Sequence, residues 1–321
     1  MKTNSNELVL VTGSSGFVAS RLIPDLSENY TVIGLDLLAG EYTEYVVDIG
    51  SASAASVLSK FSNQELTLVN LAAARFDYGA LAPDYYEKNV TAHANFLELL
   101  GNLDIKKLIH VSSVASIDGE SIPYSDLLSC DDAYRSTKYL QEQMIIEWCD
   151  KHGIGLSVLY PSAIFEIDAR SDTNVGKLQQ VAKFIPFIPK IDVVKSLTYL
   201  PYFSSFIISL LSGKVKCGKY LTIERPSITV TEMLYHLTDR KRTTIRIPFL
   251  RQALMFLSYA LNLMDFSGKR DFKLTPNRVV KLFSDTSYTH LKNDDVTIDV
   301  RTYSDGTQHS LPEILTSIVR K

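Results

Sequence analysis

The alternation of strand and helix patterns through the first half of the chain limits its fold more than any other feature. Continuous apolar runs predict strands buried on both faces, and longer amphipathic segments between them predict helices. The predicted strands cover residues 8–11, 31–35, 45–47, 67–71, 108–111 and 155–160, and the predicted helices cover 16–28 (interrupted by Pro24), 51–61, 83–100 and 133–151. Repeated βα units in this order predict an α/β fold, a doubly wound parallel sheet of the Rossmann type with helices on both faces.

This rhythm ends after Pro161, where prolines cluster, aromatic residues multiply and strand signals such as 219–223 become sparse. We therefore predict two parts. Residues 1–165 form a Rossmann domain. Residues 166–321 form a smaller mixed C-terminal lobe, with some segments returning to the sheet.

Composition excludes several classes of protein. The 321 residues are 45% hydrophobic and 21% charged, which is typical of a globular chain, and the net charge of −3 gives no reason to expect nucleic acid as a partner. The three cysteines are too few for a disulfide framework, and the six histidines are scattered singly, so we expect no metal site. The polar N-terminal residues lack the apolar region of a signal peptide. A reducing cytoplasmic location is the simplest expectation.

Two apolar stretches, 199–211 and 249–264, raise the question of membrane contact. Neither reaches the roughly 20 residues that a spanning helix needs. The second follows a basic run that includes Arg242 and Arg246. A buried or dimer-forming helix is the preferred interpretation, and weak peripheral docking on a membrane surface is the alternative.

A glycine-containing turn follows the first predicted strand. Its residues are Gly13, Ser14, Ser15, Gly16, Phe17 and Val18. Gly13 allows a tight turn, and Gly16 lets a helix N-terminus approach a dinucleotide pyrophosphate. Asp36 ends the second predicted strand 20 residues after Gly16, where a carboxylate can bind both ribose hydroxyls and would repel a 2′-phosphate. The pattern predicts NAD rather than NADP, and a solvated loop acid is the alternative for Asp36.

Further cofactor contacts are expected at the ends of the next two strands. Asp48, followed by Ile49, could accept a hydrogen bond from the adenine amino group, although an aspartate before a helix is equally typical of a cap. Leu71, Ala72 and Ala73 follow the fourth strand, where small residues let the backbone come close to the cofactor. Close packing of a helix explains these small residues equally well.

The catalytic candidates lie on one helix and one strand end. Tyr134 and Lys138 are four residues apart and therefore share a helix face. A fixed ammonium beside a phenol lowers the pKa of the phenol, which makes it a usable acid and base near neutrality. Ser113 follows the fifth strand, at the ligand edge of a doubly wound sheet, and could bind the substrate oxygen; Ser116 is the second choice. A surface helix pair and a strand-end cap are the alternatives.

Taken together, these motifs resemble the extended short-chain dehydrogenase/reductases of the NAD-dependent epimerase/dehydratase type. The matching residues, in the order that is typical of that family, are Thr12-Gly13-x-x-Gly16-Phe17, Asp36, Asp48-Ile49, Asn70 to Ala73, Asn89, Val111 to Ser113, Tyr134-x-x-Thr137-Lys138 and Tyr160-Pro161-Ser162. The resemblance implies NAD as cofactor, with Asn89 supporting the active-site helix and Pro161 approaching the nicotinamide. It further implies that residues 1–165 bind the cofactor and carry the catalytic residues, while the lobe of residues 166–321 binds the substrate. It also implies a homodimer through the helices at 84–100 and 133–151.

Several departures from the family pattern narrow the function. Ala19 replaces a third glycine, and Tyr160 stands where the family usually has arginine. Pro201-Tyr202 replaces an acidic pair, which indicates a remodelled substrate lobe. Val114 and Ala115 occupy the positions of the Asp-Glu pair of the 4,6-dehydratases, so no acid there can help to eliminate water.

The resemblance implies hydride transfer at a sugar carbinol carbon of a nucleotide-sugar, by an epimerase or by a reductase/dehydrogenase. The first alternative is a hydroxysteroid or dihydroflavonol-type dehydrogenase, with aromatic residues of the second half lining an apolar pocket, although core packing explains them more simply. These residues are Phe184, Phe187, Tyr199, Tyr202, Phe203 and Phe206. The second alternative is an NAD-sensing scaffold protein, against which the intact Ser113, Tyr134 and Lys138 argue.

Overall fold

The chain divides into two compact units in the computed structural model, which describes residues 7–74, 82–117, 133–166, 173–238, 242–263, 274–288, 296–298 and 310–319. The first unit consists of Met1–Ser162, Leu200–Thr222 and Asn293–Gly306. The second consists of Ala163–Tyr199, Ile223–Lys292 and Thr307–Lys321. Cys130, His290 and His309, named or counted in the sequence analysis, lie outside the described residues.

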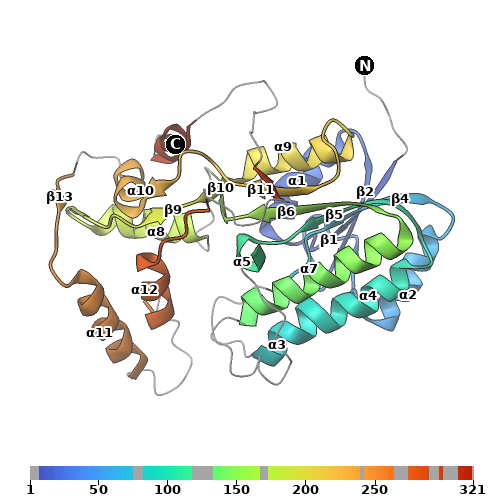
Figure 1. Ribbon diagram of the computed structural model, residues 1–321, viewed down its shortest axis with the longest axis horizontal. Helices are drawn as coiled ribbons and strands as arrows, with labels where there is room; N and C mark the ends of the chain where they lie inside the picture. The colour runs from blue at the N-terminus through green and yellow to red at the C-terminus, as the bar shows by residue number, and fades with distance from the viewer. Residues whose placement is uncertain are drawn as a thin grey trace. The chain divides into compact units, whose positions relative to one another are not determined.

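The first unit is built on a parallel sheet (Figure 1). Its described strands are β1 (Leu8–Thr12), β2 (Thr31–Asp36), β3 (Tyr45–Val46), β4 (Glu65–Asn70), β5 (Asp104–Val111), β6 (Gly155–Pro161), β11 (Lys219–Thr222) and β14 (Val296–Ile298). They lie in the order β14-β11-β6-β5-β4-β1-β2-β3. The predicted doubly wound fold is confirmed, and its strand order reverses between β1 and β4, where ligands bind in folds of this kind.

Helices cover both faces of this sheet (Figure 1). On one face lie α1 (Phe17–Ser27) and α9 (Leu200–Leu211), and on the other lie α2 (Ala52–Leu58), α3 (Ala82–Tyr86), α4 (Ala92–Leu100) and α7 (Ala133–His152). The short segments η1 (Ser59–Phe61), η2 (Glu87–Thr91) and α5 (Val114–Ile117) follow α2, α3 and β5 in the chain. Leu8 and Leu10 join the core cluster that contains Phe96 of α4, whereas Val9 is fully buried outside that cluster. Burial on both faces explains why β1 is a continuous apolar run.

The predicted interruption of the first helix at Pro24 is wrong, because α1 runs through it from Phe17 to Ser27. A proline inside a helix costs about 3 kcal/mol. Leu22, Ile23 and Leu26 beside it are at most 5% exposed, and each buried side chain of this kind contributes about 1.5–3 kcal/mol. Their burial outweighs the lost backbone hydrogen bond.

Aromatic residues of the second half that the structure describes serve mostly as core. Tyr202, Phe203 and Phe206 on α9 are at most 9% exposed, whereas Phe184 is 87% exposed. Core packing is therefore the better interpretation than an apolar substrate pocket. Among the described helices, none combines the length and the apolar character required to cross a bilayer.

Short elements make up the second unit. Its described strands, β7 (Ala163–Phe165), β8 (Ile188–Pro189), β9 (Val194–Lys195), β10 (Leu197–Tyr199), β12 (Ile228–Thr229) and β13 (Thr244–Ile245), pair two by two. Its described helices are α8 (Asn174–Phe184), α10 (Val230–His236), α11 (Leu250–Leu263), α12 (Pro276–Phe283) and α13 (Leu311–Val319). Strands of two or three residues cannot show an alternation of apolar and polar positions, which explains the sparse strand signals.

Candidate active site

The glycine turn between β1 and α1 packs against the end of β4. Gly13 has a φ of +75°, and its backbone N–H donates to the Leu35 carbonyl at 2.9 Å. A Cβ at Gly13 would lie only 2.9 Å from the amide nitrogen of Ala72. Both the backbone conformation and the lack of space therefore require glycine. Ala19, at the position of the third glycine, is fully buried, so its methyl group is accommodated.

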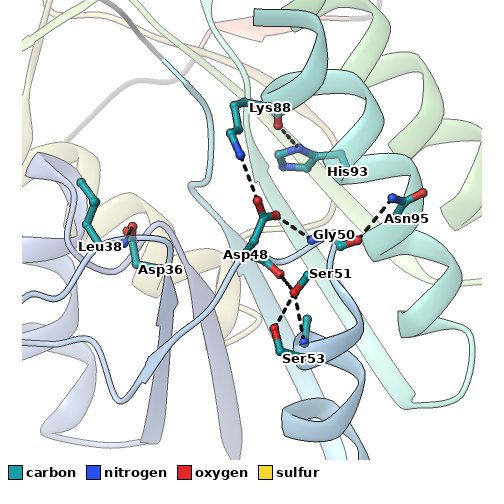
Figure 2. A network of polar contacts seen from close by, with 10 residues as sticks. Asp36, Leu38, Asp48, Gly50, Ser51, Ser53, Lys88, His93 and Asn95 are labelled. Atoms are coloured by element: carbon teal, nitrogen blue, oxygen red, sulfur yellow. Dashed lines mark hydrogen bonds and ion pairs between the residues drawn. The ribbon is translucent and has the colours of Figure 1, made fainter. Parts of the chain in front are cut away.

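Asp36 lies at the mouth of this turn, at the end of β2. Its Oδ2 accepts a hydrogen bond from the backbone N–H of Ser15 at 2.9 Å, and its Oδ1 accepts one from the backbone N–H of Leu38 at 2.9 Å. Figure 2 shows Asp36 and Leu38 side by side. The side chain is half-buried. Because a carboxylate has about four acceptor sites, further sites remain for hydroxyl donors.

Asp48 forms an ion pair rather than a helix cap (Figure 2). Its Oδ2 lies 2.9 Å from Lys88 Nζ, and its Oδ1 accepts from Gly50 N–H at 3.1 Å. Ser51 caps α2, so the cap interpretation of Asp48 is wrong. Burial alone would raise the pKa of Asp48, but the hydrogen bonds from Lys88 and Gly50 outweigh it and lower the pKa. Ile49 is 8% exposed and packs in the core cluster.

Lys138 lies in the interior, one turn of α7 after Tyr134. Its side chain is 1% exposed, and its Nζ donates to the Val111 carbonyl at 3.1 Å and to Gln141 Oε1 at 2.6 Å. Burial lowers the pKa of Lys138 to about 7, against the opposing effect of the Glu142 carboxylate. The ammonium is thus held by two uncharged oxygens close to the end of β5.

Gln141 is in turn fixed by a second buried residue, His93. Gln141 Nε2 lies 3.1 Å from the Ala72 carbonyl and 2.6 Å from His93 Nε2. Since a carbonyl only accepts, this contact identifies Nε2 as the amide nitrogen of Gln141, which leaves Oε1 to face Lys138. His93 Nε2 then accepts, and His93 Nδ1–H donates to the Lys88 carbonyl at 3.2 Å.

His93 is neutral in this arrangement. Burial lowers the pKa of His93 to about 3, and the charge of Lys138 adds to this effect. Lys88 therefore links two parts of the site, because its ammonium binds Asp48 while its carbonyl accepts from His93 (Figure 2).

A second buried cluster surrounds Glu142, one turn after Lys138. The hydroxyls of Ser112 and Ser116 lie 2.6 and 2.8 Å from Glu142 Oε2, and the Tyr160 hydroxyl donates to Oε1 at 2.6 Å. Burial has the largest effect on the pKa of Tyr160 and raises it, and the charge of Glu142 raises it further, so the phenol stays protonated. Tyr160, in place of the arginine usual in the family, thus supplies an uncharged hydrogen bond to this carboxylate.

Ser113 and Tyr134 differ from these buried hydroxyl groups because both are half-buried. Ser113 Oγ accepts from the backbone N–H of Ala115 at 3.2 Å. The ring of Tyr134 packs edge-on against Tyr85, with ring centroids 6.1 Å apart. Ser113 follows the end of β5, and Tyr134 begins α7, which also carries Lys138.

Asn89 connects the end of β4 to this helix. It lies in the π-helical segment η2, a type of irregularity that is frequent at functional sites. Its Oδ1 accepts from Ala74 N–H at 2.7 Å, while its Nδ2 lies 3.2 Å from the Ala74 carbonyl and 3.3 Å from Thr137 Oγ1. Thr137 precedes Lys138, so Asn89 supports α7 at the level of the candidate residues. Pro161 is the last residue of β6 and is buried.

Sequence reasoning missed Gln141, Glu142 and His93. Gln141 and Glu142 follow Lys138 by three and four residues, a spacing that places them on the same helix face and that could have identified them. His93 carries no comparable signal, because its partner Gln141 lies 48 residues away in the chain. No group of metal-ligating side chains occurs within the part of the chain that the structure describes.

Comparisons with known proteins identify the family of this chain. The model of the NAD dependent epimerase/dehydratase family matches residues 9–188. The chain is 24% identical over 303 residues to the N-acetyl-alpha-D-glucosaminyl-diphospho-ditrans,octacis-undecaprenol 4-epimerase of Escherichia coli O157:H7, covering 89% of this chain and 88% of that protein. It is 26% identical over 191 residues to the UDP-glucuronate 4-epimerase of Thermodesulfobacterium geofontis, covering 52% and 58% of the two chains.

The fold is similar to that of the UDP-glucuronic acid 4-epimerase from Bacillus cereus, solved in complex with NAD. The TM-score is 0.60 at 18% identity, with 75% of this chain and 86% of that chain covered. Since the family model spans more than half of the sequence, the chain belongs to the NAD dependent epimerase/dehydratase family and is an enzyme of the extended short-chain dehydrogenase/reductase type.

Proposed function

We propose that this enzyme is an NAD-dependent 4-epimerase of a sugar carried on a diphosphate, with nucleotide-sugars as the first substrate class to test. The observation that carries the proposal is the buried Lys138, held by Val111 and Gln141 one helical turn after Tyr134. The two curated relatives described above are both named as 4-epimerases, one of a UDP-sugar and one of a sugar on diphospho-undecaprenol. The names of these two relatives suggest two groups that could carry the sugar in a substrate of this enzyme, a nucleotide and a polyprenyl lipid.

The residues present fit NAD. Gly13 closes a tight turn against the backbone of Leu71 and Ala72, and this turn leads into the N-terminus of α1, where a pyrophosphate would bind. Asp36 is oriented by Ser15 and Leu38 and retains acceptor sites for ribose hydroxyls. When bound, NAD would supply a reversible hydride acceptor at its nicotinamide ring. The Lys88-paired Asp48 is the proposed acceptor for the adenine amino group.

Tyr134 is the proposed acid and base. It would take the proton of the sugar hydroxyl as a ketone forms at the carbinol carbon, and would return that proton when hydride is delivered to the opposite face. Ser113 is the proposed hydrogen-bond partner of the same oxygen. The hydroxyl of Ser116 is already bound to Glu142 in the interior, which favours Ser113 over this second choice.

Lys138 is proposed to stabilise the phenolate form of Tyr134 when its amine is protonated; because its pKa is about 7, the charged and the neutral amine are both populated near neutral pH. Its two hydrogen-bond acceptors are neutral, so neither directly cancels the ammonium charge. Gln141 and His93 would act as positioning residues, since they hold the ammonium but have no place in the proton transfer. Asn89 would hold α7 at Thr137.

The proposal is tested by incubating the purified enzyme with UDP-, GDP- and dTDP-sugars without added NAD, while mass spectrometry identifies any nucleotide bound to the protein. A 4-epimerase should contain NAD and should interconvert the two C4 epimers catalytically. If the substrate is instead oxidised or reduced, and one added NAD or NADH is consumed for each product molecule formed, the enzyme is a dehydrogenase or reductase.

Removing the charge of Asp36 should change the cofactor preference. Asp36→Asn is expected to weaken NAD binding by about tenfold, the effect of losing one charge-assisted hydrogen bond, and to improve NADP binding by a similar factor. Titration calorimetry with both dinucleotides measures the change. Glu44→Gln, which removes an exposed carboxylate from the loop before β3, should leave both affinities unchanged. An unaltered NAD to NADP ratio in Asp36→Asn would contradict the assignment.

Burial of Lys138 should make folding stability depend on pH. The pKa of Lys138 is about 7 in the folded protein, below its ordinary value of 10.5. Between these values the unfolded chain binds a proton that the folded chain lacks, so the free energy of unfolding rises with pH. Urea titrations from pH 7 to 9 should show a steeper rise for the wild type than for Lys138→Met. The exposed Lys214→Met should follow the wild type, and parallel curves for all three proteins would contradict the prediction.

A further inference from the structure

Helix α11 presents an apolar face to the solvent. Phe249, Phe256, Leu257 and Tyr259 are 77%, 78%, 47% and 55% exposed, whereas Ser258 on the same helix is fully buried. Phe256 and Tyr259 are three residues apart on α11 and therefore lie on one side of the helix, and Phe249 immediately precedes the helix. The helix thus has the reverse of the usual surface pattern, with aromatic side chains outward and a hydroxyl inward.

Phe249, just before the helix, combines this exposure with an unusual backbone conformation. Phe249 has a φ of +57°, in the left-handed region that bulky side chains rarely adopt. A strained aromatic residue that is 77% exposed gains little from burial within the fold. Such strain at an exposed apolar side chain indicates a binding role rather than a packing role.

Within residues 242–263, every charged side chain is basic. The described residues 242–263 include Arg242, Arg246 and Arg251 and contain no aspartate or glutamate. Arg242 donates to the carbonyls of Ala182 and Ile185, so its guanidinium is already bound. Arg246 and Arg251 are exposed, and they place positive charge beside the apolar side chains.

We propose that this docking face (Phe249, Phe256, Leu257 and Tyr259, with Arg246 and Arg251) binds the surface of an anionic lipid bilayer. Aromatic and aliphatic side chains together with arginines, on a helix and in the segment just before it, are features of a helix that lies in the membrane interface. Contact with a second copy is less favourable, because a two-fold interface would bring like charges together. The proposal does not depend on the proposed reaction, although docking would bring the enzyme to a lipid-carried sugar.

The test is flotation of the full-length protein with vesicles of phosphatidylcholine, with and without phosphatidylglycerol, in the absence of substrate. We expect binding to the anionic vesicles only, with a loss when salt is raised to about 0.5 M, where charges are screened within a few ångströms. Phe256→Ser should weaken binding by about tenfold, as expected for removing one buried aromatic side chain. Arg246→Glu/Arg251→Glu should weaken it at least as much.

Leu38→Ser is the matched control, because Leu38 is 65% exposed but lies in the loop after β2. Its vesicle binding should equal that of the wild type. Light scattering without vesicles completes the test by measuring the oligomeric state. If the wild type forms a concentration-dependent dimer and the Phe256→Ser variant does not, the face binds a second copy and the proposal is overturned. Absence of binding to any vesicle would overturn it as well. Since Phe256 is 78% exposed, circular dichroism should show an unchanged fold in Phe256→Ser.

Discussion

Tyr134→Phe is expected to lower the turnover number about a thousandfold while the affinity for NAD stays within a factor of two. A positioned general acid and base contributes roughly 10²–10⁴-fold to rate, and the substitution removes only the hydroxyl that would carry the proton. The edge-on contact with Tyr85 needs only the ring, so the local packing should survive. Single-turnover kinetics and NAD titration measure the two quantities separately.

Tyr139→Phe makes the same chemical change five residues later on the same helix. Tyr139 is half-buried and has no role in the proposed site, so this variant should keep its activity. If Tyr134→Phe were as active as Tyr139→Phe, another group would have to move the proton. A loss of NAD binding in Tyr134→Phe would instead point to a structural effect.

The second large effect is expected from Gly13→Ala, compared with Gly153→Ala. Both glycines have positive φ angles, +75° and +64°, but a Cβ would meet the Ala72 backbone at the first position and nothing within 4 Å at the second. In Gly153→Ala, the free energy of unfolding should therefore fall only by the cost of holding an alanine in the left-handed conformation, about 1–2 kcal/mol. Gly13→Ala must also displace the backbone that follows β4.

That displacement should affect ligand binding as well as stability. The Ala72 carbonyl accepts from Gln141, so a shift of this segment would disturb the support of Lys138. We expect the affinity of Gly13→Ala for NAD to fall by tenfold to about a hundredfold, in line with the 1–3 kcal/mol typical of overpacking. Calorimetric titration and urea unfolding of both variants measure this. Equal NAD affinities in the two variants would show that the turn does not approach the cofactor.

Much of the first unit follows from sequence patterns because its signals are local. The buried parallel strands are rich in apolar residues, and Gly13, Asp36 and Ser113 each lie at or just after the end of such a strand. The carboxyl ends of parallel strands share one edge of the sheet, so their proximity follows from the topology. The placement of Tyr134 and Lys138 on one helix face follows from their spacing alone.

The support of the site is harder to predict because it depends on contacts between distant residues. The bond between Gln141 and His93 joins α7 to α4, and no local pattern indicates it. The same holds for Tyr160, whose substitution for arginine becomes understandable only when its hydroxyl is found at Glu142. The wrong prediction at Pro24 has the opposite cause. A proline is a strong local signal for a break in a helix, but the burial of its neighbours, which depends on tertiary structure, keeps α1 continuous.

The interleaving of the two units limits how this protein can be divided. Because α9, β11 and β14 are supplied by the second half of the chain, a fragment that stops near residue 165 would leave β6 as an open edge and α1 without its neighbour α9. No single cut yields either unit whole. The nucleotide-binding half is therefore not an autonomous module, and during synthesis its sheet gains β11 only after residue 222 has emerged and β14 later still.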